Sequence, residues 1–194
     1  MVTGRAAVFL DRDGTLTRPR HYPSRPEHLV LADHVGPWLR VLQERGVALV
    51  VVTNQSGLAR GYFGTTDLDA MHRGLRGQLA AWRVRLDGIY ACPHHVDGSV
   101  PHLAVHCGCR KPAPGILLRA ADELRLDPAR SWMVGDAASD VAAGHRAGCR
   151  TALVGPAAPG DTGSAVRPDL RTEAAWEALR HIAEHLGDAG RTGC

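Results

Sequence analysis

Acidic residues follow two apolar runs of this sequence, and they are the first candidates for chemistry. In "FLDRDGTL", Asp11 and Asp13 stand two residues apart, and Gly14 can turn the chain behind them. Two carboxylates in that position can face one cavity, one as a nucleophile or metal ligand and the other for proton transfer. In "GDAASD", Asp136 and Asp140 follow another apolar run. Several carboxylate and carbonyl oxygens around one point suit a hard cation such as Mg2+.

The acidic and polar segments also have plain structural interpretations. An Asp-Gly turn accounts for the first motif, and Asp140 could cap the helix that begins beside it. In "VVTNQSG", Thr53 and Asn54 supply a hydroxyl and an amide before a helix, where short donors can hold a phosphate oxygen. A polar turn explains that segment equally well.

The chain has a single lysine, Lys111, among its 23 lysine and arginine residues. A compact ammonium fits between a phosphoryl oxygen and a carboxylate in a crowded site, where a planar guanidinium is too large. Arg110 beside it offers a forked donor for a second anion. An ordinary surface position is the alternative, but the use of Arg at every other basic position favours a specific role for Lys111.

Four possible metal ligands lie in the segment around residues 92–109. Cys92-x-His94 and Cys107-x-Cys109 combine three thiolates with one imidazole, a set that suits tetrahedral Zn2+. The usual two-residue gap is absent, so free thiols remain an open alternative on spacing alone. Cys149 is expected to be a buried small residue, and Cys194 a thiol in the C-terminal tail. The neighbouring rings of His95, His102 and His106 are expected to face solvent.

The site residues need a framework, and the hydrophobic pattern predicts one. Apolar runs at 6–10, 47–52, 88–91, 132–134 and 151–154 have the character of strands buried on both faces of a parallel sheet. Amphipathic helices are expected at 35–42, 68–82, 116–124 and 176–186, the second capped by Thr66 with Asp69. This alternation predicts one Rossmann-like, doubly wound α/β domain over residues 1–194, with a frayed tail at 187–194 and ligands at the carboxyl ends of the strands.

Composition argues against several classes of partner. The net charge is +3 and the arginines are scattered, so we expect no nucleic-acid partner. The longest apolar run, at 47–52, is far short of a membrane-spanning helix, and no signal peptide is evident, so we expect no membrane association. The expected state is a cytoplasmic monomer that acts on a small molecule.

Four segments, in this order, resemble the motifs of the haloacid dehalogenase-like phosphatases: "DRDGT", "TNQ", "RKP" and "GDAASD". The resemblance covers about residues 8–154. More narrowly, "TNQSGLARGYF", the Cys/His loop and "CRKP" resemble the D-glycero-D-manno-heptose 1,7-bisphosphate phosphatases and the related histidinol-phosphate phosphatases. The resemblance implies a Mg2+-dependent phosphatase without a large cap domain, which works through an aspartyl-phosphate.

The same resemblance implies a role for each motif residue. Asp11 is the implied nucleophile, Asp13 the acid and base, and Lys111 the catalytic cation. Mg2+ would be held by Asp11, Asp136 and the carbonyl of Asp13, with support from Asp140. The implied substrate-binding residues are Thr53, Asn54, Gln55 and Arg110, and the implied ligands of a structural Zn2+ are Cys92, His94, Cys107 and Cys109.

The substrate is the least determined part of these expectations. Related phosphatases commonly carry Lys or Arg after the fourth-motif Asp, and here that position is Ala137. Only the segment at 17–25, the Cys/His loop and the region of Tyr62 could cover the site, so a sizeable substrate fits. We expect removal of the 7-phosphate of the heptose bisphosphate, with histidinol phosphate as the alternative substrate. A zinc-stabilised binding module and a nucleic-acid 3′-phosphatase are less consistent with the residues.

Overall fold

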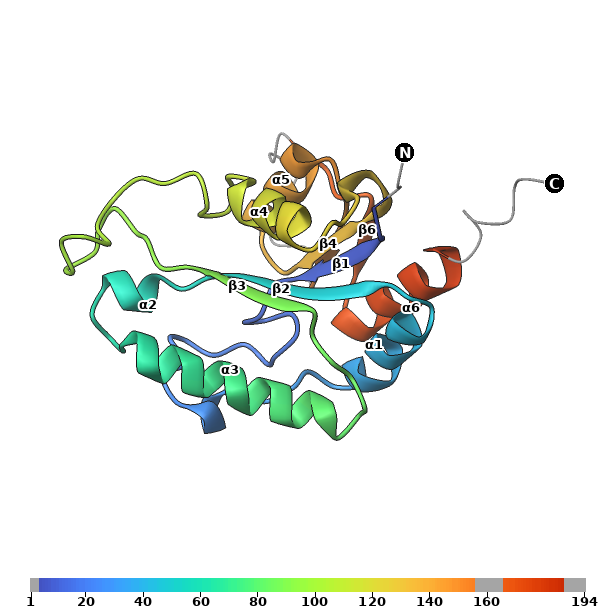
Figure 1. The fold of residues 1–194 in the computed structure, drawn as a ribbon, viewed down its shortest axis with the longest axis horizontal. Helices are drawn as coiled ribbons and strands as arrows, with labels where there is room; N and C mark the ends of the chain where they lie inside the picture. Colours follow the sequence, from blue (N-terminus) through green and yellow to red (C-terminus); the bar gives the residue numbers. More distant parts are fainter. Residues whose placement is uncertain (1–3, 156–165, 187–194) are drawn as a thin grey trace.

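The computed structural model describes residues 4–155 and 166–186. Its centre is a six-stranded sheet in the order β3-β2-β1-β4-β5-β6, in which every neighbouring pair is parallel (Figure 1). The strands are β1 (Ala7–Leu10), β2 (Ala48–Asn54), β3 (Gly88–Cys92), β4 (Trp132–Gly135), β5 (Arg150–Val154) and β6 (Leu170–Thr172). The Rossmann-like parallel sheet expected from the apolar runs is therefore confirmed.

Helices cover both faces of this sheet. They are α1 (Val35–Glu44), α2 (Ser56–Ala59), α3 (Thr65–Ala80), α4 (Gly115–Glu123), α5 (Ala138–Ala147) and α6 (Ala175–Leu186), with short 3-10 turns at Pro26–His28 and Pro128–Arg130. Figure 1 shows α4 and α5 on one face and α1, α3 and α6 on the other. Alternate residues of β1 enter the two cores: Val8 and Leu10 pack on the side of α1, α3 and α6, and Ala7 and Phe9 on the side of α4 and α5.

The start of α3 differs from the prediction. The helix begins at Thr65, and the Asp67 carboxylate accepts a hydrogen bond from the Gly64 amide at 2.8 Å. The expected cap by Thr66 with Asp69 is therefore wrong, because Thr66 already lies within the first turn and the carboxylate that reaches back to the free amide is two residues earlier.

Strand order fixes where a site can form. The chain runs from β1 outward to β2 and β3, then returns to add β4, β5 and β6 on the other side of β1. The order therefore reverses between β1 and β4, and ligands bind at such a point, beyond the carboxyl ends of the strands. Within the described residues, no helix has the length and apolar character needed to cross a membrane. The expected frayed tail and Cys194 lie outside the described residues.

Candidate functional site

Three carboxylates meet at the point where the strand order reverses. Asp11 directly follows β1, and its amide donates to the Val134 carbonyl of β4 at 2.9 Å. Asp136 follows β4, and Asp140 lies in the first turn of α5. Carboxylate oxygens of these three residues lie within 4.8 Å of one another. The structure thus brings together the acids of both "DRDGT" and "GDAASD".

The ammonium of Lys111 lies within this acidic cluster. Its Nζ donates to Asp11 Oδ1 at 2.6 Å, contacts Asp140 Oδ1 at 2.7 Å and donates to the Val52 carbonyl at 2.8 Å. The residue is only 3% exposed. These contacts use all three donors of the ammonium. Asp140 also accepts from the Ala137 amide at 3.1 Å, so it caps α5 and pairs with Lys111 at the same time.

The main chain of Lys111 is fixed by Asn54, at the end of β2. Asn54 Nδ2 donates to the Lys111 carbonyl, and the Lys111 amide donates to Asn54 Oδ1, both at 3.0 Å. Both polar atoms of the Asn54 side chain therefore position the lysine, a role that was not predicted from the sequence. Asn54 was expected to bind substrate, and it also lines the pocket beside Asp13.

Burial and crowding raise the pKa values of charged groups of the site. Burial, together with the negative charges of Asp140 and Asp136, raises the pKa of Asp11 to about 7, against the lowering effect of Lys111. Burial and Asp140 raise the pKa of Asp136 to about 6. Burial opposes the charge on Lys111, but Asp11 and Asp140 outweigh it and raise the pKa of the ammonium. One ammonium facing three carboxylates leaves an excess of negative charge, which fits a divalent cation.

Gly14 allows the two acidic segments to approach each other. Its φ of +88° lies in the left-handed region, and a Cβ at this position would lie 2.1 Å from Asp136 Oδ2. A side chain here would push Asp136 away from the cluster.

Asp13 is held by Arg12 and Gln55, and His72 lies beside Arg12. Arg12 donates to both of its carboxylate oxygens, from Nε at 3.0 Å and from Nη2 at 2.8 Å. Gln55 Nε2 donates to Asp13 Oδ2 at 2.9 Å and to Thr53 Oγ1 at 2.8 Å. His72 Nε2, from α3, lies 3.5 Å from Arg12 Nη1. Gln55 therefore orients Asp13 and Thr53, in addition to the substrate-binding role expected for it.

Arg12 and His72 are site residues that were not predicted from the sequence. Arg12 is fully buried, which is rare for this residue type and requires a partner. Burial, together with Arg12, lowers the pKa of His72 to about 4, so its ring is neutral at physiological pH and can accept a hydrogen bond. The signal in the sequence was the arginine between the two acids of "DRD", directly after a fully apolar strand.

A pocket of about 200 Å3 opens beside these residues. Asp13 and the "NQSG" segment form one wall, and the segment after β1, from Arg20 to Pro23, forms the other. The Tyr22 ring meets the Tyr62 ring edge to face, with centroids 4.7 Å apart. The segment at 17–25 and the region of Tyr62 therefore meet beside the site, as the sequence suggested.

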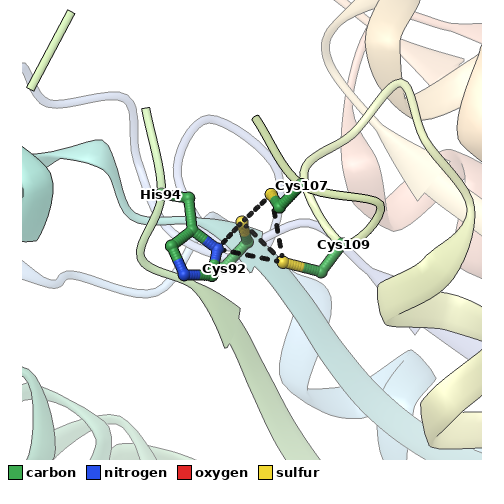
Figure 2. A group of neighbouring side chains, drawn as sticks. All are labelled: Cys92, His94, Cys107 and Cys109. Carbon is green, nitrogen blue, oxygen red and sulfur yellow. Dashed lines mark hydrogen bonds between the residues drawn. The ribbon is translucent and has the colours of Figure 1, made fainter. Parts of the chain in front are cut away.

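Three thiols and one imidazole converge in the loop between β3 and α4 (Figure 2). The sulfur of Cys109 lies 3.0 Å from that of Cys92 and 3.3 Å from that of Cys107, and the Cys92 and Cys107 sulfurs are 3.6 Å apart. His94 Nδ1 lies 3.4 Å from the Cys109 sulfur. Four soft or borderline donors around one point fit a closed tetrahedral Zn2+ site.

The spare histidines of the loop behave differently from one another. His102 and His106 are exposed, as expected. His95 is not simply solvent-facing, because its ring is half-buried and lies 3.5 Å from Arg60 Nη2. Burial, together with the charges of Arg110 and Arg60, lowers the pKa of His95. Within the described residues, the buried Nε of Arg60 has no hydrogen-bond partner. The charges of Arg60 and Arg110 therefore both act on the His95 ring.

A Rossmann-like sheet with an aspartate after β1, and with a buried lysine between the acids of two motifs, defines a haloacid dehalogenase-like hydrolase. The chain belongs to this family: the haloacid dehalogenase-like hydrolase model matches residues 24–148, and the HAD-hydrolase-like model matches residues 108–189.

The chain is also similar to individual phosphatases, in sequence and in structure. The chain is 42% identical to the D-glycero-beta-D-manno-heptose-1,7-bisphosphate 7-phosphatase of Escherichia coli K12, over 92% of this chain and 90% of that protein. A crystal structure of a HAD-like phosphatase from Mesorhizobium loti has a TM-score of 0.82 and 40% identity, covering 95% of this chain and 88% of that one. The D,D-heptose 1,7-bisphosphate phosphatase of B. bronchiseptica, complexed with magnesium and phosphate, has a TM-score of 0.78 and 29% identity, covering 92% of this chain and 98% of that one.

Proposed function

We propose that this chain is a Mg2+-dependent phosphatase that removes the 7-phosphate of D-glycero-D-manno-heptose 1,7-bisphosphate through an aspartyl-phosphate. The observation that carries the proposal is the bridge from Lys111 to Asp11 and Asp140 where the strand order reverses, with Asp136 beside it. The 42% identity to a curated heptose bisphosphate phosphatase over nearly the whole chain supports this substrate.

The proposed reaction has two steps, both at Asp11. A carboxylate oxygen of Asp11 attacks the phosphorus of the 7-phosphate, and Asp13 gives its proton to the leaving O7. Asp13 then takes a proton from water, which attacks the phosphorus of the aspartyl-phosphate and restores the Asp11 carboxylate. Lys111 supplies positive charge beside the phosphoryl group, and Thr53 binds a phosphoryl oxygen. When bound, Mg2+ supplies positive charge to the phosphoryl oxygens and keeps the buried carboxylates ionised.

The ligands proposed for Mg2+ are the carboxylates of Asp11 and Asp136 and the main-chain carbonyl of Asp13. The donor set consists of oxygens, as this hard cation prefers. Asp140 supports the site through Lys111 rather than as a primary ligand, because one of its oxygens already contacts the ammonium and the other caps α5.

The arginine pair beside His95 supports a bisphosphate as the substrate. Arg60 and Arg110 both act on the half-buried His95 ring, and the buried Arg60 Nε has no partner among the described residues. Two positive charges that act on one ring favour an anion beside it. We propose that they receive the second phosphate of the substrate, which histidinol phosphate lacks.

A phosphate-release screen with Mg2+ tests the proposed substrate. We expect kcat/KM for the heptose 1,7-bisphosphate to exceed that for histidinol phosphate by about 100-fold, the contribution expected from a well-bound second phosphate. Arg110→Gln should reduce that ratio by lowering the bisphosphate value alone. A preference for histidinol phosphate, or equal efficiency on both, would overturn the proposed substrate and leave a phosphatase of another or broader specificity.

Arg12 should set the position of Asp13 without touching the phosphate. We expect Arg12→Gln to lower kcat by about 10- to 100-fold and to leave KM nearly unchanged, because the proton-transfer group loses its bidentate contact. Arg18→Gln is the matched control, because Arg18 pairs with Asp33 on the exposed surface. An Arg12→Gln enzyme with normal kcat, or one whose kcat falls while its KM rises, would rule out this role.

The cysteine-histidine cluster has a structural role in our proposal. It would hold one Zn2+ with no open coordination position, and so fix the loop that carries Arg110 and Lys111. Arg110 Nη1 donates to the His94 carbonyl at 3.3 Å, and Lys111 lies two residues after Cys109, so the loop and the site are directly connected.

Cys107→Ser tests the zinc proposal. We expect the variant to lose stoichiometric zinc, to lower kcat/KM by at least about tenfold, and to become protease-sensitive first within residues 93–110. Cys149→Ser is the control, since that buried cysteine lies outside the cluster. Metal analysis of freshly purified protein measures the first effect. Protein without zinc, together with an unchanged Cys107→Ser variant, would refute the structural metal.

Mg2+ should stabilise the protein more at high pH than at low pH. The pKa of Asp11 is raised to about 7 and that of Asp136 to about 6, both from 3.8. A carboxyl with a raised folded pKa binds its proton more tightly when folded, so these two groups lower the stability of the metal-free protein as pH rises from about 4 to 7. Bound Mg2+ offsets the cost of ionisation. We expect a larger Mg2+-induced rise in Tm at pH 8 than at pH 5.5, and loss of most of it in Asp136→Asn. Equal shifts at both pH values would contradict this.

A further inference from the structure

A second cavity lies at the end of the sheet opposite the acidic cluster. Its volume is about 420 Å3, and it is formed by segments that precede or begin strands β1, β2, β4 and β5, together with the end of α6. Asp11 follows the other end of β1, so about 13 Å of strand separates the two sites. The cavity has the size of a small-molecule pocket.

The wall of this cavity is strongly basic. Its charged and titratable residues are Arg5, Arg45, Arg130, Arg150 and His185, and the described lining includes no Asp or Glu. Among the residues that the structure describes, Arg5 alone of this set pairs with a carboxylate, that of Asp87. The chain as a whole carries a net charge of only +3. Positive charge is therefore concentrated here, beside low-dielectric walls that strengthen its field.

Three of these guanidiniums have no carboxylate partner within the described residues. Arg45 Nη1 donates to the Ala183 carbonyl in α6, and Arg130 Nη1 donates to the Gly4 carbonyl at 3.3 Å. Arg150 stacks on the buried Trp132 ring, 4.2 Å from its centroid. A guanidinium has five N–H donors, so each of the three retains free donors. Forked donors of this kind bind phosphoryl oxygens in pairs.

We propose that this cavity is a second ligand site, which binds a small molecule carrying a di- or triphosphate group. Three guanidiniums without a carboxylate partner, with Arg5 and His185 beside them, match the roughly three to four negative charges of such a group. The site is separate from the proposed active site and does not depend on the proposed reaction. Its ligand would reach the enzyme without competing with the substrate.

Calorimetric titration with inorganic pyrophosphate tests this site. Mg2+ is left out, because it would bind the probe and because the metal-free acidic cluster then repels the anion. We expect one binding event with a Kd below about 1 mM at low salt, weakened as salt rises. The Arg45→Gln/Arg150→Gln double variant should bind at least about tenfold more weakly, since it loses two charge-assisted donors. Its kcat/KM on the bisphosphate should stay within about two-fold of the unmodified protein.

The control is the double variant Arg40→Gln/Arg119→Gln, whose arginines lie outside the cavity and pair with Glu44 and Glu123. It should bind pyrophosphate like the unmodified protein. Binding that survives Arg45→Gln/Arg150→Gln, or that falls equally in the control, would overturn the proposal, as would no detectable binding. Each of these results is independent of whether the heptose bisphosphate is a substrate.

Discussion

Asp11→Asn should abolish turnover while leaving the fold intact. The amide has the shape of the carboxylate, but it does not supply the anionic oxygen that forms the aspartyl-phosphate. We expect kcat to fall by at least about 10^4-fold, because no covalent route remains. Single-turnover phosphate release from the heptose bisphosphate with Mg2+ measures the loss.

The stability of the same variant separates chemistry from folding. Asp11 is one of three crowded acids, and its pKa of about 7 shows that the folded state disfavours its ionised form. Lys111 keeps its contacts with Asp140 and the Val52 carbonyl when Asp11 becomes Asn. We therefore expect an unchanged or higher urea midpoint in the metal-free variant. Asp33→Asn, at an exposed position, is the control. An active Asp11→Asn enzyme would remove Asp11 as the nucleophile, and an unfolded one would reassign it to structure.

Lys111→Met should damage both catalysis and stability. The variant leaves the buried carboxylates of Asp11 and Asp140 without their cation, and breaking a buried pair in this way costs about 3–5 kcal/mol. We expect kcat to fall by about 10^2- to 10^3-fold, because the charge opposite the transferring phosphoryl group is lost. Urea unfolding and steady-state kinetics measure the two effects. The stability loss should shrink when Mg2+ is added, since the metal also neutralises Asp11.

Lys111→Arg should not restore activity. The lysine is only 3% exposed, and its three donors contact oxygens at 2.6–2.8 Å, which leaves no room for a guanidinium. Arg119→Lys, on the exposed face of α4, is the control for exchanging these residue types. Full activity in Lys111→Arg would mean that only a positive charge is needed, and the argument from the single lysine would fail.

The strand ends of the site could be predicted from sequence for a clear physical reason. Strands buried on both faces are continuous apolar runs, and parallel strands place their carboxyl ends at one edge. The hydrophobic pattern alone therefore predicts that Asp11 and Asp136 lie at the same edge of the sheet. Strand β6 (Leu170–Thr172) was not predicted, because it is three residues long and partly exposed at the edge of the sheet. Such a strand has no apolar run in the sequence.

Contacts that depend on packing between distant segments could not be predicted. The support of Asp13 by Arg12 and His72 requires α3 to pack beside the segment after β1, across 60 positions of sequence. The paired contact of Asn54 with the Lys111 main chain spans 57 positions. Scattered arginines were expected to be surface charge, yet Arg45 and Arg150 reach one cavity because α1 ends and β5 begins beside it. Residue type gives the chemistry available, and only the fold gives the partners.

Trapping the covalent intermediate gives the decisive result for the proposed enzyme. The protein is mixed with the heptose 1,7-bisphosphate and Mg2+, quenched with borohydride, which reduces an acyl phosphate to an alcohol, and digested for mass spectrometry. The proposed function predicts homoserine at position 11, dependent on both substrate and Mg2+, and unreduced Asp at position 13. Reduction at position 13, or no reduction during active turnover, would contradict an aspartyl-phosphate at Asp11.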